Sequence, residues 1–277
     1  MFLWTEESAA FWNDSAAYTK SYDLLAEQAA ARLPSGCTVF EGGCGLGHLS
    51  AALAKGGYAV TAMDLSPLPL RYLRERADRA GGTLTVRQGD AFALPAGEVY
   101  DAGVFCFFGA VGETLAWARD HCRNTLILFK KDWNTHRFTR DPGAVRKFTY
   151  PLTCAELERR GVPFTAEVFD ADMGQPFRSL SDAIRFFRLY DPEAAMTEGE
   201  ILSRLAKTGD PVFPYYLPAV RPVGMIVIRA RDIPRLGGIE HETYCHPAAG
   251  GSDAAVPCLF HGQGPGGPRA HRSAEDR

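Results

Sequence analysis

Three glycines that alternate with other residues, directly after an apolar run, constrain the fold of this 277-residue chain more than any other feature. They lie in the segment Val39-Phe40-Glu41-Gly42-Gly43-Cys44-Gly45-Leu46-Gly47-His48. The apolar run ends in an acid and indicates a strand, and the Ala- and Leu-rich stretch that follows indicates a helix. Only residues without a Cβ make so tight a turn and let a ligand touch the backbone. The segment therefore predicts a strand-loop-helix unit that holds a nucleoside-type ligand.

The spacing of these glycines separates classes of ligand. A dinucleotide fingerprint that starts at Gly43 needs its third glycine at position 48, where the chain has His48. A phosphate-binding P-loop needs Gly-Lys followed by Ser or Thr, and the chain offers Gly47-His48-Leu49. A phosphate-binding loop is therefore the weaker interpretation of this segment.

Short apolar runs alternate with helical stretches on both sides of the loop. We expect strands at 38–41, 59–63, 84–88, 101–107 and 125–129, and helices at 46–55, 68–80 and 112–121. This alternation predicts an α/β fold with a doubly wound, Rossmann-like, mostly parallel sheet and helices on both faces. Further on we expect helices at 153–160, from Ser179 or Ser181 to Tyr190, and at 197–207, and strands at 164–169 and 223–229. If the last two strands pair, the sheet gains an antiparallel edge strand.

The acids and glycines at the strand ends resemble the motifs of the class I S-adenosylmethionine-dependent methyltransferases. The pattern Glu41-x-Gly43-x-Gly45-x-Gly47 is similar to the first motif of that family, and Asp64 ends the second strand as the family's ribose-binding acid does. Gln88-Gly89-Asp90-Ala91 follows the third strand, and Tyr100 to Phe107 is similar to the fourth strand. The resemblance spans residues 37–129, and the later strands complete the fold to about Arg231.

The resemblance implies S-adenosylmethionine as the cofactor. The residues it places against the cofactor are Glu41, Gly43, Gly45, Gly47, Asp64, Leu65, Asp90, Ala91 and Phe105. One ionised carboxylate can accept hydrogen bonds from both hydroxyls of a ribose, which suits Asp64. Asp90 either accepts from the adenine amino group or caps the next helix. Glu41 either holds the loop and complements the positive sulfonium, or caps the strand end.

The implied reaction is methyl transfer, which requires alignment of a nucleophile and exclusion of water rather than a catalytic triad. Nucleic-acid and glutamine amino-methyltransferases carry an Asn/Asp-Pro-Pro-aromatic motif after the fourth strand, whereas this chain has Phe105-Cys106-Phe107-Phe108-Gly109. We therefore expect methyl transfer to O or N of a small-molecule acceptor. A tRNA or protein acceptor, a non-catalytic module that binds the cofactor or its demethylated product, and, more distantly, a nicotinamide-dependent oxidoreductase remain as alternatives.

Residues for the acceptor and for proton transfer are less constrained by the sequence. His136 follows the fifth strand and is the candidate general base, with a solvated loop histidine as the alternative. Candidate substrate-binding residues are Tyr18, Phe108, Arg178 and Tyr215. Arg178 either pairs with a substrate carboxylate or forms a surface salt bridge.

Composition divides the chain into three parts. Residues 1–35 are rich in aromatic and helix-forming residues, with one helix expected over 15–32, and form either a helical lid or a packed extension. Residues 36–231 form the methyltransferase domain, with helical insertions after its fifth and sixth strands. Residues 232–277 are rich in Gly, Pro and His and are expected to be a disordered tail.

Charge and cysteine content restrict partners and location. Thirty Lys and Arg against 33 Asp and Glu give a net charge of -3, which disfavours nucleic acid, and no apolar run reaches the ~20 residues of a membrane span. The basic residues at 71, 74, 76 and 79 are interpreted as a solvated helix face. Seven cysteines without C-x-x-C spacing and the lack of a leader sequence predict a cytoplasmic protein with no metal site. The oligomeric state is open, a homodimer included.

Overall fold

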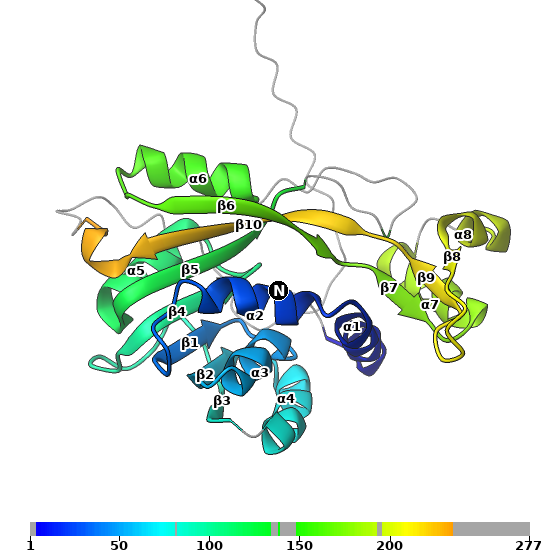
Figure 1. The fold of residues 1–277 in the computed structure, drawn as a ribbon, viewed down its shortest axis with the longest axis horizontal. Helices are drawn as coiled ribbons and strands as arrows, with labels where there is room; N and C mark the ends of the chain where they lie inside the picture. The colour runs from blue at the N-terminus through cyan, green and yellow to red at the C-terminus, as the bar shows by residue number, and fades with distance from the viewer. Residues whose placement is uncertain (1–3, 81, 134–137, 139–147, 193–195, 235–277) are drawn as a thin grey trace, which may run out of the picture. The chain divides into compact units, whose positions relative to one another are not determined.

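A seven-stranded sheet organises the chain, with the strand order β3-β2-β1-β4-β5-β10-β6 (Figure 1). The computed structural model describes residues 4–80, 82–133, 138, 148–192 and 196–234. The strands are β1 (Thr38–Gly42), β2 (Ala59–Asp64), β3 (Leu84–Gln88), β4 (Tyr100–Cys106), β5 (Cys122–Lys131), β6 (Thr165–Asp172) and β10 (Val220–Arg229). Strands β3, β2, β1, β4 and β5 are parallel, as the alternating pattern predicts.

Strand β10 is the antiparallel member of this sheet. It pairs antiparallel with both β5 and β6, so it lies one position in from the edge, and β6 forms the edge itself. The predicted pairing of the last two long strands is confirmed, and only the place of the antiparallel strand differs. Its apolar run from Val223 to Ile228 is largely buried, because its side chains enter the core clusters on both faces of the sheet.

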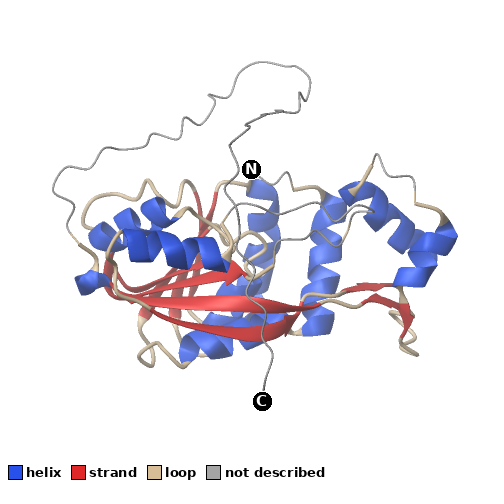
Figure 2. Cartoon of the chain, turned by 90° about the horizontal axis from the view of Figure 1, so that it is seen from above, coloured by secondary structure: helices blue, strands red, loops and turns tan. Residues whose placement is uncertain are grey.

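Helices cover both faces of the sheet (Figures 1 and 2). The helices around the sheet are α2 (Ser21–Ala30), α3 (His48–Lys55), α4 (Pro67–Ala80), α5 (Val111–His121) and α6 (Tyr150–Arg159). Helix α1 (Glu6–Thr19) precedes them and packs on strand β7 (Gln175–Phe177) and helix α7 (Leu180–Tyr190). Helices α2 and α3 pack on the face that carries Val39, and helices α5 and α6 pack on the face that carries Phe40. Neighbouring residues of a strand point to opposite faces, so each strand contributes to two separate core clusters.

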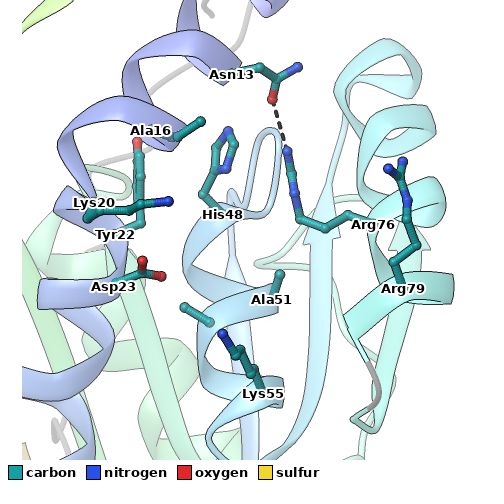
Figure 3. A pocket seen from close by; sticks show the side chains of 12 residues that line it. Asn13, Ala16, Lys20, Tyr22, Asp23, His48, Ala51, Lys55, Arg76 and Arg79 are labelled. Atoms are coloured by element: carbon teal, nitrogen blue, oxygen red, sulfur yellow. Dashed lines mark hydrogen bonds between the residues drawn. The ribbon is translucent and has the colours of Figure 1, made fainter. Parts of the chain in front are cut away.

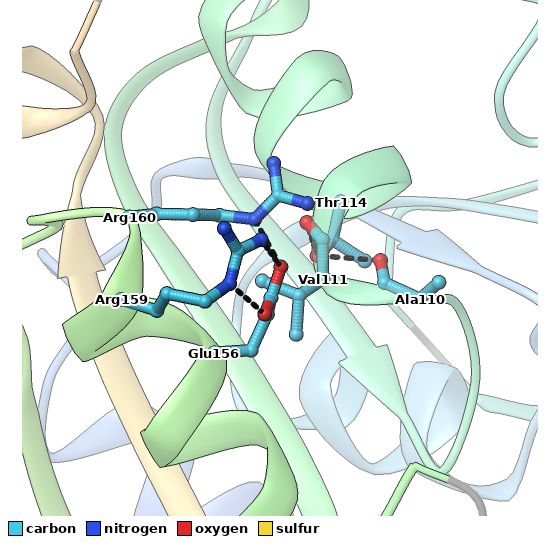
Figure 4. Close-up of polar contacts among 6 residues, drawn as sticks. All are labelled: Ala110, Val111, Thr114, Glu156, Arg159 and Arg160. Atoms are coloured by element: carbon cyan, nitrogen blue, oxygen red, sulfur yellow. Dashed lines mark hydrogen bonds and ion pairs between the residues drawn. The ribbon is translucent and has the colours of Figure 1, made fainter. Parts of the chain in front are cut away.

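Helix α6 lies beside the start of α5 (Figure 4). Glu156 accepts hydrogen bonds from Arg159 at 2.8 and 2.7 Å and from Arg160 at 2.5 Å. These bonds, led by that from Arg159, lower the pKa of Glu156 to about 2. The network keeps the Arg160 side chain close to Gly112 in the first turn of α5.

The N-terminal segment forms two helices, so the prediction of one helix over 15–32 is wrong. Helix α1 starts after Thr5, whose side chain accepts from the Ser8 backbone N–H. It stops at Lys20, which has the left-handed backbone angles φ 56° and ψ 21°, and α2 starts with the next residue. A lysine in this conformation carries no glycine or proline signal, which is why the sequence pattern does not predict the break.

A second, three-stranded sheet lies beyond the end of β6 and the start of β10, with the strand order β7-β9-β8 (Figure 1). Its elements and the two helices beside it are β7 (Gln175–Phe177), β8 (Ala206–Lys207), β9 (Tyr215–Leu217), α7 (Leu180–Tyr190) and α8 (Glu198–Arg204). The helix predicted over 197–207 is too long, because Leu205 is extended and the next two residues form β8. Phe11 of α1 packs into the apolar cluster of this part, 5.1 Å from the ring of Phe186.

We predict that Gly103→Ala destabilises the fold through the packing of α5 on β4. A Cβ at Gly103 would lie 2.2 Å from the buried ring of Trp117, and overpacking of this kind costs about 2 kcal/mol. Urea unfolding followed by circular dichroism measures the change. Gly199→Ala in α8 is the matched control, because its Cβ would meet no atom within 4 Å. Equal stability of Gly103→Ala and the parent chain would contradict the packing described.

Candidate functional site

The glycine loop and the acid of β2 meet at the carboxyl ends of β1 and β2. The Gly45 backbone N–H donates to Asp64 Oδ2 at 2.9 Å, and the Ser66 N–H donates to Asp64 Oδ1 at 2.8 Å. The Cys44 N–H donates to the Met63 carbonyl at 3.1 Å, so the loop is fixed to the end of β2 at two points. Two motifs that are 19 residues apart in the sequence therefore form one structural unit.

Three glycines of the loop have backbone angles that other residues rarely adopt: φ is 67° at Gly43, 52° at Gly45 and 65° at Gly47. The space around these glycines is limited as well. A Cβ at Gly47 would lie 2.3 Å from Leu73 of α4, and one at Gly43 would lie 2.2 Å from the ring of Phe108. The loop thus presents bare backbone to neighbours that leave no room for a side chain.

Aromatic rings lie on this bare backbone. Phe108 lies against Gly43, and Trp4 lies 3.1 Å from the position of a Cβ on Gly45. Phe92 lies beside Phe105 and Phe108 with nearly parallel rings, its centroid 5.6 and 5.5 Å from theirs, and those two centroids are 6.5 Å apart. The surroundings of the loop are therefore apolar and flat, which suits a ligand with planar or apolar parts.

Glu41 is buried beneath the loop and accepts a hydrogen bond from the Ser50 hydroxyl of α3. Burial raises the pKa of Glu41 to about 8, with the Ser50 bond acting in the opposite direction. The carboxyl is therefore mostly protonated near pH 7 in the chain alone. It connects β1 to α3, so it holds the two sides of the glycine loop together.

The other residues that the resemblance places at the cofactor differ in how far they are exposed. Asp90 is exposed and accepts from the Phe92 backbone N–H at 2.9 Å, which closes a turn; no helix begins there, so Asp90 does not cap one. Leu65 is exposed, whereas Ala91 is buried. Phe105 is fully buried, and a Cβ at Gly42 would lie 2.5 Å from its ring, so it supports the floor of the loop from below.

A buried lysine holds the segment after β4. Lys130 Nζ donates to the Phe108 carbonyl at 2.9 Å and to the Gly109 carbonyl at 2.8 Å. Burial lowers the pKa of Lys130 to about 8. Phe107, in the same segment, has a left-handed φ of 53°, and this turn brings the Phe108 ring onto the glycine loop. The only sequence signal for Lys130 is a charge directly after the apolar run of β5.

Tyr22 of α2 lies over the start of α3. Its ring stacks on His48, with centroids 5.3 Å apart and planes 25° apart. Burial raises the pKa of Tyr22. Its ring packs against the core cluster that Cys106 at the end of β4 also contacts. The sequence pattern groups Tyr22 only with other aromatic residues and does not distinguish it.

The remaining substrate candidates gather at the small sheet. Tyr18 packs on Phe213 and Tyr216, with centroids 5.7 and 5.1 Å away. Arg178 forms an ion pair with Asp14 at 2.6 Å and lies over the Phe213 ring. Tyr215 is in β9 of the same sheet. Phe108 is the one candidate of this set that lies on the glycine loop, and the proposed base His136 lies outside the described residues.

These residues fit the cofactor that the sequence implies. The carboxylate of Asp64 lies at a strand end beside bare backbone, as recognition of a sugar diol by a carboxylate requires. The described residues contain no group of three or more His, Cys, Asp or Glu that could hold a metal ion. Nor does any helix among them combine the length and the apolar character that crossing a membrane requires.

Part of the chain is similar to known proteins. Residues 39–125, from β1 into β5, match the family model of a methyltransferase domain. A search of curated proteins gives no match. The solved structures that this chain resembles include YjhP from E. coli, with 14% identity over 79% of this chain and 99% of that one and a TM-score of 0.49.

Two further solved structures resemble this chain at similar levels. One is a SAM-dependent methyltransferase from Thiobacillus denitrificans in complex with S-adenosyl-L-homocysteine, with 17% identity over 78% of this chain and 96% of that one and a TM-score of 0.48. The other is YcgJ from Bacillus subtilis, with 13% identity over 76% of this chain and 97% of that one and a TM-score of 0.48.

We predict that Glu41 makes stability fall as the pH rises. Its pKa is raised from 4.5 to about 8 on folding, so between these values the folded chain keeps a proton that the unfolded chain has lost. Relative to Glu41→Gln, the parent should lose about 1 kcal/mol of unfolding free energy per pH unit between pH 5 and 8, and no more above that range. Urea unfolding at several pH values measures this slope. The exposed Glu27→Gln is the control, and parallel slopes for parent and Glu41→Gln would contradict the assignment.

Proposed function

We propose that this chain is an S-adenosylmethionine-dependent methyltransferase that methylates an oxygen or a nitrogen of a small-molecule acceptor, since residues 39–125 match the family model of a methyltransferase domain. The observation that carries the proposal is the hydrogen bond from the Gly45 N–H to Asp64. It joins the bare backbone of the loop to the strand-end carboxylate, and such a pair suits a ligand with an amino-acid part and a ribose.

In this proposal the loop from Gly43 to Gly47 borders the methionine part of the cofactor, and Asp64 accepts from the ribose hydroxyls. Asp90 is the candidate for the adenine end, because its exposed carboxylate follows β3. When bound, S-adenosylmethionine supplies an electrophilic methyl group. The protein then has to align the acceptor and exclude water, which requires side chains that enclose the acceptor rather than a nucleophilic side chain.

The acceptor class is inferred from what surrounds the loop. Phe108, Trp4 and Tyr22 give this end of the sheet an aromatic character, which favours an organic molecule with apolar parts. Lys130 positions the Phe108 backbone and so helps to shape the wall on the β4 side. The net charge of -3 does not favour a polyanionic acceptor.

The N-terminal helices, within residues 1–35, are proposed as the cover of the site. Trp4 lies at Gly45, and Tyr22 stacks on His48 directly after the glycine loop, so α1 and α2 both approach it. The described cysteines are all unpaired, which is in keeping with the reducing cytoplasm as the proposed compartment.

We predict that Asp64→Asn weakens binding of S-adenosylhomocysteine at least about tenfold, because a neutral amide accepts less strongly from the ribose hydroxyls. Isothermal titration calorimetry measures the affinity. Asp78→Asn, in the exposed part of α4, removes the same charge and should bind as the parent does. Equal affinity of Asp64→Asn and the parent would remove Asp64 from the cofactor site.

The acceptor class can be tested with labelled cofactor. Incubation of the chain with methyl-labelled S-adenosylmethionine and a deproteinised metabolite extract should give a labelled small molecule, and Asp64→Asn should reduce its yield. Parallel reactions with total RNA and with protein extract test the alternative. Label that appears only in RNA or protein would overturn the small-molecule proposal while leaving the methyl transfer in place.

A further inference from the structure

A groove outside the glycine-loop site runs along the outer side of α3, between the N-terminal helices and α4 (Figure 3). Its volume is about 310 Å³. Small residues of α3 and α1, such as Ala51 and Ala16, form part of its lining, so polar side chains around them can reach a bound molecule. The groove shares Tyr22 and His48 with the proposed cover of the site, and none of the residues proposed for the cofactor lines it.

Basic side chains from three separate helical segments gather around this groove. Lys20 lies between α1 and α2, Lys55 is in α3, and Arg76 and Arg79 are in α4, whereas Asp23 is the one carboxylate of the lining. Neither lysine has an ion pair within the described part of the chain. The ion pair of Arg79 with Glu75 is long and exposed, with 4.0 Å between the guanidinium and the carboxylate. The groove thus carries more positive than negative charge.

Arg76 is held by neutral groups. It donates to the Leu46 carbonyl at 2.6 Å and to Asn13 Oδ1 at 3.0 Å, so no carboxylate compensates its charge in these bonds. Burial, followed by the charge of Arg79, lowers the pKa of Arg76. Arg76 and Arg79 are three residues apart on α4, so their like charges repel, and a bound anion would relieve this repulsion.

His48 adds an unused polar atom. Its Nε2 is buried and has no hydrogen-bond partner among the described residues, and the ring lines the groove beside Arg76 (Figure 3). Burial lowers the pKa of His48 to about 3, so the ring is neutral near pH 7. A neutral imidazole can donate to or accept from a bound oxyanion, depending on its tautomer and on the ligand's protonation.

We propose that this groove binds a small, multiply charged oxyanion, carrying phosphate or carboxylate groups, through Lys20, Lys55, Arg76 and Arg79. Arginine forks and lysine ammonium groups are the side chains that recognise such oxygens. Exposed acids also occur in the helices that carry these residues, Glu27 in α2 and Glu75 and Asp78 in α4. Such acids favour a small anion over a long nucleic acid, whose phosphates they would repel.

The test is calorimetric titration of the full chain with inorganic pyrophosphate and, separately, with citrate, at constant ionic strength and without cofactor. We expect saturable binding of at least one of them, weakened at least about tenfold in the double variant Lys55→Gln/Arg79→Gln. The tighter ligand identifies the phosphate or the carboxylate class. Arg76 is left intact, because its bonds to Leu46 and Asn13 also hold the fold.

The matched control is Arg74→Gln/Lys207→Gln, which removes the same charge from exposed positions outside the groove. It should bind the anion as the parent does, and thermal unfolding should show that both double variants are folded. Absence of saturable binding, an equal loss in both double variants, or binding of a 20-nucleotide RNA without binding of pyrophosphate or citrate would overturn the proposal.

Discussion

The hydrogen bond between the Gly45 N–H and Asp64 is the interaction on which the site depends. It requires β1 and β2 to be adjacent and parallel, so that their carboxyl ends meet at one edge of the sheet. It also requires a loop with no Cβ, because Leu73 and Phe108 occupy the space that side chains would need. Sheet order, loop composition and helix packing therefore converge on a single contact.

Polar groups buried around that contact connect the elements that carry the loops. Glu41 is joined to Ser50 of α3, and Lys130 of β5 is joined to the carbonyls of the segment after β4. A buried polar group without partners costs free energy, so these bonds favour one arrangement of the segments they link. Both groups have pKa values near 8, which reflects their removal from water.

The sequence was sufficient to predict the main sheet. Strong β-branched runs, glycine turns and the acid at the end of β2 identify the parallel strands, and the fold class is confirmed. The small sheet was missed because strands of two or three residues, such as β8 and β7, have no recognisable period. The division of the N-terminal helix depends on the backbone angles of Lys20, which its side chain does not reveal.

The site was predictable only where a motif carries it. The glycines and Asp64 are recognisable from spacing, and the structure brings them together. Lys130, Tyr22 and Arg76 acquire their surroundings from segments distant in the chain, so no local pattern identifies them. The same applies to the cluster of arginines in α4, two of which face a groove shared with three other helical segments rather than open solvent alone.

Three consecutive residues in the middle of helix α1 contact different parts of the molecule. Trp12 donates to the Tyr190 hydroxyl at 3.0 Å and Phe11 enters the apolar cluster there, while Asn13 accepts from Arg76 beside the glycine loop. The helix thus connects the small sheet with the glycine loop through neighbouring residues. Since Arg76 bonds both Asn13 and the Leu46 carbonyl of the loop, a movement of the small sheet would also shift this contact beside the loop.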